Sequence, residues 1–251
     1  MKVFSVVGTS LTGKTTTIEN IIQELRKRRY SIGSVKDIHY EKFAIDTEGT
    51  NTDRHYKAGS QLVTARGIYE TDILFKNRLS IKDILRFYDH DFVVLEGVED
   101  FVAPKIICAS TTDEIDDKLD ATAIAISGKI ANKINEYRGI PAVNALEEPV
   151  LLVDLIEKQV CPVLPNMAED CCNECGYSCK KLLERIIRGK SKRDECLLER
   201  ESQIRLTIDG KKIDIVPFVQ AVLKNTVKGV VKELEGYKQH AEIKIEIKKE
   251  E

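Results

Sequence analysis

The sequence predicts an α/β protein with a mostly parallel sheet, followed by a cysteine-rich metal-binding segment and a small β-β-α-β unit. Three observations lead to this fold class. Short apolar runs alternate with helical periodicity up to about residue 160, as in a parallel sheet covered on both faces. Six of the seven cysteines fall between residues 161 and 196, and apolar and polar residues alternate with a period of two after residue 204. We therefore expect domains at residues 1–160, 161–200 and 201–251.

The first domain begins with a phosphate-binding motif. Residues 8–15 read G-x-x-x-x-G-K-T, after an apolar run at 3–7 and before a helical pattern at 16–29. Strand, glycine loop and helix N-terminus together favour an anion, because backbone N–H groups and the helix dipole converge there. This predicts a P-loop NTPase fold in which Lys14 reaches the β- and γ-phosphates and the Thr15 hydroxyl binds Mg²⁺. The expected nucleotide-binding residues are Gly8, Thr9, Ser10, Thr12, Gly13, Lys14, Thr15 and Thr16.

The other elements of this domain follow from apolar runs and periodicity. Strands are expected at residues 31–36, 62–65, 72–75, 92–95, 105–109, 121–126 and 141–143, and helices at 81–88 and 151–159. The stretch 37–57 is polar with little periodicity, which indicates a long loop that is either functional or disordered. Residues 111–120 are acidic and are expected to form a solvated loop or helix.

Several polar residues are expected near the γ-phosphate of a bound nucleotide. Glu96 ends a buried strand level with the phosphate loop, so it is expected to hold Mg²⁺ through water or to polarise the attacking water. Lys14 and Glu96 are therefore the catalytic candidates. Asp37 and Asp46 are further candidates near the γ-phosphate, and Asp37, which follows the second strand, could complete the metal shell. The basic residues around the polar loop could bind a second anionic substrate, although their spacing alone favours a solvated loop: Lys36, His39, Arg54 and His55.

Bulk composition and hydropathy limit the classes of partner and the cellular compartment that we expect for this protein. The formal net charge is −2, which gives no argument for nucleic acid or an anionic membrane. No apolar stretch approaches the roughly 20 residues that span a bilayer, and no signal peptide is apparent. We expect a cytoplasmic protein. In a reducing compartment, clustered cysteines indicate metal or redox chemistry more often than disulfides.

The cysteine cluster has the spacing of a metal site. Cys172-x₂-Cys175-x₃-Cys179-x₁₆-Cys196 supplies four thiolates, with Cys171 beside the first as a possible substitute. Four thiolates suit either a [4Fe–4S] cluster or zinc, and spacing alone leaves both open. A helix is expected between the third and fourth ligands. Outside the cluster, Cys108 lies in an apolar strand and is expected to be inert core.

The last part of the chain reads as a small β-β-α-β unit. Residues 204–208 and 213–216 alternate around Asp209-Gly210, a turn signal typical of a hairpin. Residues 217–234 begin with proline and carry apolar side chains at helical spacing. Residues 242–248 alternate again and predict a final strand.

The first domain resembles the molybdopterin-guanine dinucleotide biosynthesis adapter family, MobB. The matching pieces are residues 8–16, Val35-Lys36, residues 46–49 with 52–55 and 58–59, and residues 95–97 with 104–106. The resemblance implies a P-loop α/β fold that is commonly dimeric and binds GTP. It also implies a partner, the nucleotidyltransferase that joins GMP to molybdopterin. Under this resemblance, Lys14, Thr15 and Thr16 hold phosphate and metal, and Glu96 lies near the γ-phosphate.

The cysteine segment is similar to the four-cysteine [4Fe–4S] domain of corrinoid iron–sulfur proteins. The similarity covers residues 161–200, and Cys179 and Cys196 have that family's spacing. Cys175 to Cys179 is one residue shorter than is usual there. The resemblance implies that Cys172, Cys175, Cys179 and Cys196 hold an iron–sulfur cluster, and it favours iron over zinc.

These observations combine into one main hypothesis and three alternatives. The main one is a GTP-binding protein, with ATP as the alternative nucleotide, that assists molybdenum or tungsten cofactor biosynthesis and carries an accessory [4Fe–4S] domain. Under this hypothesis the protein is a weak GTPase and a homodimer. Its partner is a molybdopterin nucleotidyltransferase or another molybdoenzyme maturation protein. The runner-up is a nucleotide-gated iron–sulfur electron carrier or metallocluster maturation factor. A small-molecule kinase is disfavoured because residues 111–120 lack arginine. A non-enzymatic dimeric adapter, stabilised by its nucleotide, also remains.

Overall fold

The computed structural model describes residues 1–41, 43–166, 175–197, 204, 206–213, 215, 217–238 and 243–247. The chain divides into two compact units. The first consists of Met1–Asn166 and Cys179–Arg193, and the second of Met167–Ser178 and Asp194–Glu251. Each unit is described by itself below.

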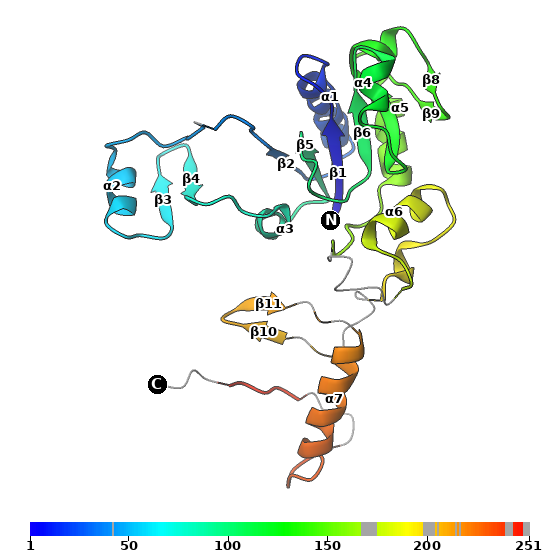
Figure 1. The fold of residues 1–251 in the computed structure, drawn as a ribbon. Coiled ribbons are helices and arrows are strands. Elements are labelled where there is room, and N and C mark those ends of the chain that lie inside the picture. The colour runs from blue at the N-terminus through cyan, green and yellow to red at the C-terminus, as the bar shows by residue number, and fades with distance from the viewer. Residues whose placement is uncertain are drawn as a thin grey trace. The chain divides into compact units, whose positions relative to one another are not determined.

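A five-stranded parallel sheet is the centre of the first unit (Figure 1). The strand order is β2-β5-β1-β6-β7, and each neighbouring pair runs parallel. This confirms the α/β fold with a mostly parallel sheet. The strands are β1 (Lys2–Val7), β2 (Ile32–Lys36), β5 (Phe92–Glu96), β6 (Lys105–Cys108) and β7 (Ala123–Ser127).

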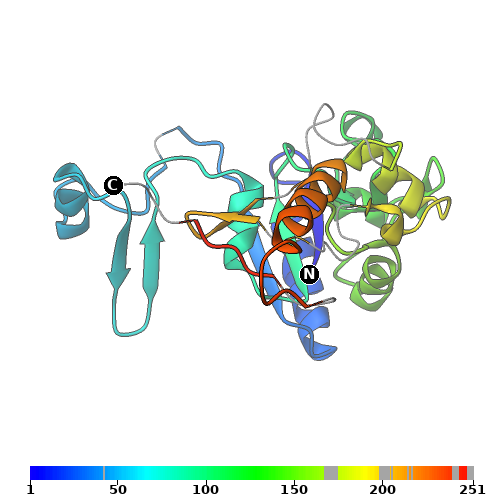
Figure 2. The same ribbon diagram turned by 90° about the horizontal axis from the view of Figure 1, so that it is seen from below.

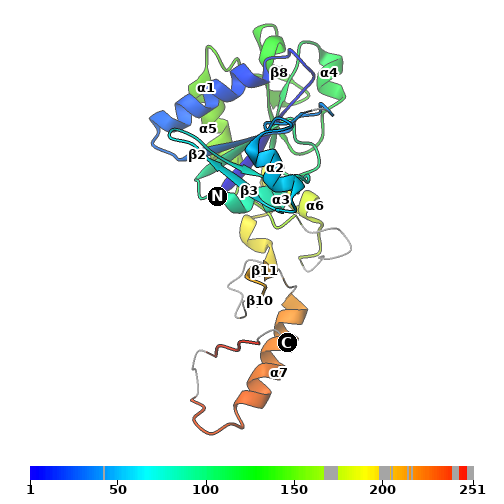
Figure 3. The ribbon, with the colours of Figure 1, turned by 90° about the vertical axis from the view of Figure 1, so that its left-hand side faces the viewer.

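One face of the sheet is covered by two neighbouring helices, α1 (Lys14–Lys27) and α5 (Pro149–Gln159) (Figure 3). Their apolar faces pack on the alternate strand residues that point to this side, as helical and strand periodicity require. A single core cluster results, which includes Phe4, Val6, Ile18, Ile21, Leu25, Phe92, Val94, Ile106, Ile124, Leu152, Val153 and Ile156.

The opposite face is covered in two separate parts. Over β5 and β1 lie α3 (Ile81–Ile84) and the 3₁₀ helix η1 (Leu85–Phe87), packed on Val3, Val93 and Leu95. Over β6 and β7 lie α4 (Thr112–Asp116) and the 3₁₀ helix η2 (Gly128–Asn132), packed on Val7, Ile107 and Ile126. Ser5 belongs to neither cluster, although it stands between Val3 and Val7 on the same side of β1.

The polar stretch expected to be a loop contains a helix. We call residues 51–74 the arm; it consists of α2 (Asn51–Lys57), β3 (Val63–Arg66) and β4 (Thr71–Leu74). The Thr50 side chain caps α2 by accepting a hydrogen bond from the Asp53 N–H. Strands β3 and β4 were both expected, but they pair with each other, antiparallel, and do not join the main sheet (Figure 2).

The remaining elements are short. In the first unit, β8 (Glu136–Tyr137) pairs with β9 (Ile140–Pro141), and α6 (Cys179–Ile187) buries Leu182 and Leu183. The 3₁₀ helix η3 (Arg193–Glu195) includes the last residue of the first unit. In the second unit, β10 (Leu206–Ile208) and β11 (Lys211–Ile213) form the expected hairpin around Asp209-Gly210, although β11 begins two residues before the strand expected at 213–216. Helix α7 spans Pro217–Val231.

One expected strand is wrong. Residues 243–247 are not a strand, and residues 242 and 248 lie outside the described part of the chain, so the described second unit is β-β-α. A segment with an alternating pattern becomes a β-strand only when its backbone hydrogen-bonds to a neighbouring strand, and within the described ranges residues 243–247 have no such neighbour. Among the described helices, none combines the length and the apolar character that crossing a membrane requires.

Candidate functional site

The phosphate loop joins β1 to α1 and has the backbone of an anion-binding turn. Gly13 caps α1 in the left-handed region, with φ of 101°, and Leu11 is also left-handed, with φ of 63°. Gly8 follows the last residue of β1 with φ of 148°. Glycine at 8 and 13 therefore allows a loop that L side chains would strain, and its N–H groups lead into the helix N-terminus.

Two glycines also let the loop pack against neighbouring backbone. A Cβ added to Gly8 would lie 2.0 Å from the Cys108 carbonyl oxygen at the end of β6. A Cβ added to Gly128 would lie 2.2 Å from the Thr12 carbonyl oxygen, and the N–H of Lys129 donates to that oxygen at 3.2 Å. Gly128, which the motif does not contain, is therefore part of the support beneath the loop.

Lys14 lies folded over the loop. Its Nζ donates to the carbonyl oxygens of Gly8 at 2.9 Å and Thr9 at 2.5 Å. The Thr12 hydroxyl donates to the Thr9 carbonyl at 2.9 Å, so it braces the same turn from inside, while Ser10 and Thr16 are exposed. The ammonium is thus held within the curve of the loop, where a phosphate group would meet it together with the backbone N–H groups.

Glu96 and Thr15 meet beside the loop, as their sequence positions suggest. The Thr15 hydroxyl donates to Glu96 Oε1 at 3.1 Å, and Lys36 Nζ donates to the same oxygen at 3.0 Å. Glu96 ends β5, Lys36 ends β2, and the two residues are paired in the register of the sheet. A hydroxyl and a carboxylate oxygen at this spacing are the ligand types that Mg²⁺ prefers, so the donor set fits that ion.

A second carboxylate contacts the loop from α4. Glu114 Oε1 accepts a hydrogen bond from the Thr9 hydroxyl at 2.7 Å. The N–H of Ser110 donates to Glu114 Oε2 at 2.6 Å, and this bond, followed by the one from Thr9, holds the pKa of the Glu114 carboxyl below its ordinary value. Sequence reasoning did not single out Glu114. The signal was present, because Thr111-x-x-Glu114 is a capping box that fixes this side chain at the start of α4.

The other polar candidates are distributed differently. The backbone N–H of Asp37 donates a hydrogen bond to the carbonyl oxygen of Glu96 at 2.9 Å, and the Asp37 carboxylate forms an ion pair with Arg78 at 3.1 Å. Asp46 belongs with the arm: it accepts hydrogen bonds from Thr50, Thr52 and the Thr47 N–H, and no described contact joins it to the phosphate loop. His39 is near Asp37, at 3.8 Å, whereas Arg54 and His55 lie on α2.

The four predicted cysteine ligands are only partly described. Cys171 and Cys172 lie outside the described residues, Cys179 starts α6 in the first unit, and Cys175 and Cys196 belong to the second. Within the described ranges no three His, Cys, Asp or Glu side chains gather as metal ligands. The metal site therefore stays a prediction. Cys108 is fully buried in β6, and burial raises the pKa of its thiol to about 11, which agrees with inert core.

Comparison with known proteins connects this geometry to a family. The model described as molybdopterin guanine dinucleotide synthesis protein B, MobB, matches residues 3–127. A protein of Methanocaldococcus jannaschii named as a molybdopterin-guanine dinucleotide biosynthesis adapter is 31% identical over 254 residues, covering 98% of this chain and 97% of the relative. The chain belongs to the MobB family.

Other MobB relatives match the first part of the chain. The adapter protein named from Bacillus subtilis is 25% identical over 162 residues, covering 63% of this chain and 92% of the relative. The crystal structure of Bacillus subtilis MobB has the same fold, with a TM-score of 0.51 and 23% identity over 65% of this chain and 100% of that structure. The longer alignment with the Methanocaldococcus protein also takes in the cysteine segment and the C-terminal unit.

Proposed function

We propose that this protein binds GTP with Mg²⁺ at residues 8–16 and acts as an adapter in molybdenum or tungsten cofactor biosynthesis, at the molybdopterin guanine dinucleotide step. The observation that carries the proposal is the meeting of Lys14, Thr15 and Glu96 around a glycine loop at a helix N-terminus. Membership of the MobB family supports the pathway, since its relatives are named as adapters for that dinucleotide.

Each residue of the loop has a distinct task in this proposal. Backbone N–H groups of the loop and the Lys14 ammonium bind the β- and γ-phosphates, and Thr15 and Glu96 hold Mg²⁺, which neutralises charge on the phosphate oxygens when bound. Glu96 orients a water in line with the γ-phosphate. As the water oxygen bonds to the γ-phosphorus, the bond from that phosphorus to the β-phosphate oxygen breaks, GDP leaves, and the water's proton passes to the released phosphate. Lys14 stabilises the negative charge that develops on the phosphate oxygens. Hydrolysis is expected to be slow and switch-like, as for a protein whose nucleotide controls partner binding.

Nucleotide titration of the full chain tests this proposal. Lys14→Ala is expected to weaken GTP binding about 100-fold or more, because a charge-assisted contact to two phosphates is lost. Lys133→Ala, which removes an exposed lysine elsewhere, is the matched control and should bind as the wild type does. Competition with ATP then measures the preference for the base. Unchanged binding by Lys14→Ala would contradict the proposed site.

Glu96→Gln separates binding from turnover. The amide keeps the shape and accepts a hydrogen bond from Thr15, but it lacks the charge that favours Mg²⁺ and a polarised water. We expect turnover to fall about tenfold or more, with a higher Mg²⁺ requirement and a smaller change in GTP affinity. A turnover rate equal to that of the wild type would remove Glu96 from the mechanism.

We further propose that the arm mediates a homodimer. Ile68 and Tyr69, at the tip of the β3–β4 hairpin, are 91% and 99% exposed. An isolated two-stranded hairpin is marginally stable, so a second copy packed against it would bury these side chains and complete a layer. Sedimentation should show a dimer for the wild type and a monomer for the Ile68→Ser, Tyr69→Ser double variant. Leu146→Ser, at another exposed apolar residue, is the control.

The accessory [4Fe–4S] domain is also part of the proposal, and its support is the spacing of the four cysteines. Iron and acid-labile sulfide in near-equal amounts, lost on Cys175→Ser or Cys196→Ser, are expected from protein purified without oxygen. Cys108→Ser should keep both, because that thiol is buried in β6. Zinc, or no metal, would contradict the cluster. Reversible reduction of such a cluster, coupled to nucleotide turnover, would instead favour the electron-carrier alternative.

A further inference from the structure

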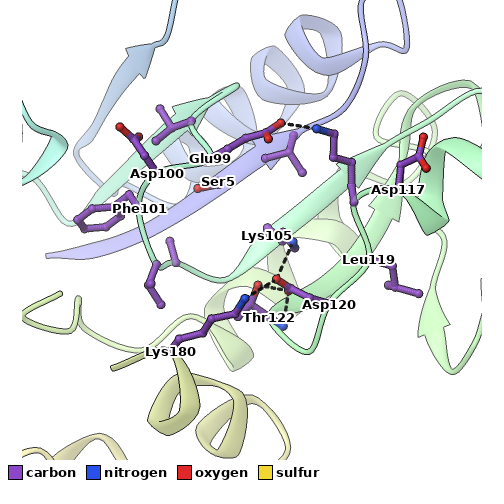
Figure 4. A pocket seen from close by; sticks show the side chains of 15 residues that line it. Ser5, Glu99, Asp100, Phe101, Lys105, Asp117, Leu119, Asp120, Thr122 and Lys180 are labelled. Carbon is purple, nitrogen blue, oxygen red and sulfur yellow. Dashed lines mark hydrogen bonds and ion pairs between the residues drawn. The ribbon is translucent and has the colours of Figure 1, made fainter. Parts of the chain in front are cut away.

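A cavity of about 450 Å³ opens on the second face of the sheet, at the junction between its two covered parts (Figure 4). Its walls come from both sides of that junction. Val98 and Phe101 belong to the cluster under α3, whereas Val7 and Leu119 belong to the cluster under α4. The volume falls within the range of about 300–1,000 Å³ typical of small-molecule sites.

The floor of the cavity is Ser5, in the middle strand of the sheet. Ser5 is 3% exposed, and its hydroxyl has no hydrogen-bond partner among the described residues. A buried polar group without a partner is unusual in a folded protein and is unfavourable. A molecule that enters the cavity and pairs with this hydroxyl would therefore gain a hydrogen bond that the empty protein lacks.

The charges around the cavity disfavour an anion. Three lysines and four carboxylates line it, so no positive excess is present. Each lysine is also already paired: Lys105 and Lys180 with Asp120 at 3.1 and 3.3 Å, and Lys118 with Glu99 at 2.5 Å. A phosphate or carboxylate would have to displace these carboxylates while lying close to others, at an electrostatic cost.

Between its paired charged residues the cavity also has an apolar part, which favours a compact, flat and uncharged molecule. Val7, Val98, Ala103 and Leu119 present aliphatic surface, and Phe101 adds an aromatic ring. Such walls bind the faces of a ring system, while the single hydroxyl of Ser5 can both donate to and accept from its polar edge.

We propose that this cavity is a second binding site, for an uncharged bicyclic heterocycle of the pterin or purine kind. The choice among flat molecules rests on the proposed function, because the dinucleotide named for the family contains a pterin and a guanine ring. The existence of the site does not depend on that function, since it follows from the cavity and from Ser5.

The position of the cavity links it to the phosphate loop. One wall continues directly from Glu96, which binds Thr15, and the other follows α4, whose Glu114 binds Thr9. Lys118 and Glu99 join the two walls. Occupancy of the cavity and occupancy of the loop are therefore expected to alter each other's affinity, by the same factor in both directions.

Saturation-transfer NMR with pterin as the probe tests the site on the full chain. Wild-type protein should transfer saturation to pterin, whereas naphthalene-2-sulfonate, a bicyclic anion of similar size, should receive little. Leu119→Trp, which fills the cavity, should abolish the transfer. Leu146→Trp adds the same side chain at an exposed residue outside the cavity and should leave it intact. Ser5→Ala should weaken pterin binding about threefold to tenfold, the effect of one hydrogen bond.

Two results would overturn the proposal: no transfer to pterin at millimolar concentration, or transfer that both Leu119→Trp and Ser5→Ala leave unchanged. The Lys14→Ala variant keeps this test separate from that of the phosphate loop. Pterin binding that survives Lys14→Ala supports the cavity, whether or not GTP binding has failed. Pterin binding that disappears in Lys14→Ala but persists in Leu119→Trp would assign the probe to the loop and contradict the inference.

Discussion

The two faces of the central sheet are built from the same strands but differ in how they are covered. On one face α1 and α5 lie side by side, and their side chains form one continuous cluster with the strands. On the other face the clusters under α3 and α4 are separate, and a charged cavity lies at their junction. Continuous cover contributes stability, whereas interrupted cover leaves room for a ligand at a cost in buried apolar area.

The phosphate loop takes part in both arrangements. It starts α1, on the covered face, and it contacts Glu96 and Glu114, whose following segments line the cavity on the other. The continuous cluster under α1 and α5 holds the start of the helix that follows the loop. On the opposite face, which we call the open face, the cavity leaves room for side chains to adjust when a ligand binds. Four experiments test this contrast.

The largest expected effect separates the two faces directly. Leu152→Ala on α5 removes a fully buried side chain from the continuous cluster, and we expect a loss of about 4 kcal/mol in the free energy of unfolding. Leu85→Ala, at the edge of the α3 cluster, should cost about 2–3 kcal/mol, because water and neighbouring side chains can fill the space. Chemical denaturation measures both. Equal or reversed losses would contradict the contrast between the faces.

A smaller effect is expected where charged groups join the two helices of the covered face. The Arg28 guanidinium donates to Glu24 at 3.1 Å and to Asp154 at 2.7 Å, and it also donates to Glu157. Arg28→Ala should lower the free energy of unfolding by about 1–3 kcal/mol, since the carboxylates of Glu24 and Glu157, which are 10% and 29% exposed, lose a positively charged partner. The adjacent Lys27→Ala, at a side chain that is 71% exposed, should change it by less than about 0.5 kcal/mol.

The open face should show a pH dependence that comes from one carboxylate, Asp120. Burial raises the pKa of the Asp120 carboxyl, but hydrogen bonds from Thr122 and the charge of Lys105 outweigh it and lower this pKa to about 2. Since the unfolded chain takes up the proton first as the pH falls, the stabilisation is complete above about pH 4 and disappears as the pH drops towards 2.

Asp120→Asn should therefore cost about 1–2 kcal/mol at pH 7, after allowance for a side chain that is one-third exposed, and little once the pH has fallen below about 2. Thermal unfolding of both proteins across this pH range measures the difference. Asp89→Asn removes an exposed carboxylate and should show no such dependence. A constant difference from pH 7 to pH 2 would show that packing, and not charge, explains the loss.

The smallest effect is expected at the pair that joins the cavity walls. Lys118→Met removes the contact to Glu99, whose side chain is 59% exposed, and the cost should be below about 1 kcal/mol and should shrink in high salt. A loss well above that value, unaffected by salt, would mean that the pair holds the walls together and that the open face is less adaptable than we infer.

The sequence was most informative where structure is determined locally. The strand, loop and helix from Lys2 to Lys27 were predicted because glycine positions and apolar periodicity act over a few residues. The position of Glu96 beside Thr15 was also predictable, because parallel strands end at the same edge. For the arm, the two strands were expected but their separation from the main sheet was not, since short apolar runs carry no information about which strand they pair with.

Features made by distant segments could not be predicted. Gly128 supports the loop through a contact with Thr12 that no motif encodes. The cavity brings Ser5 together with residues near 100 and 120, and in the sequence Ser5 appears only as a polar interruption of an apolar strand. Residues 243–247 show the opposite case. Their regular alternation of apolar and polar residues predicted a strand, but they do not form one, and no partner strand lies beside them among the described residues.

The strand order has a consequence for biosynthesis. The strand that precedes all the others in the chain, β1, is the middle strand of the sheet, and Lys2 pairs with Phe92 while Ser5 pairs with Lys105. A growing chain must therefore keep an apolar strand unpaired until both partners have left the ribosome. Such long-range pairing folds slowly and leaves β1 open to aggregation or to a chaperone during translation. Slower synthesis anywhere between residues 8 and 108, the arm included, would lengthen that interval, so folding yield in the cell should depend on codon choice there more than after residue 127.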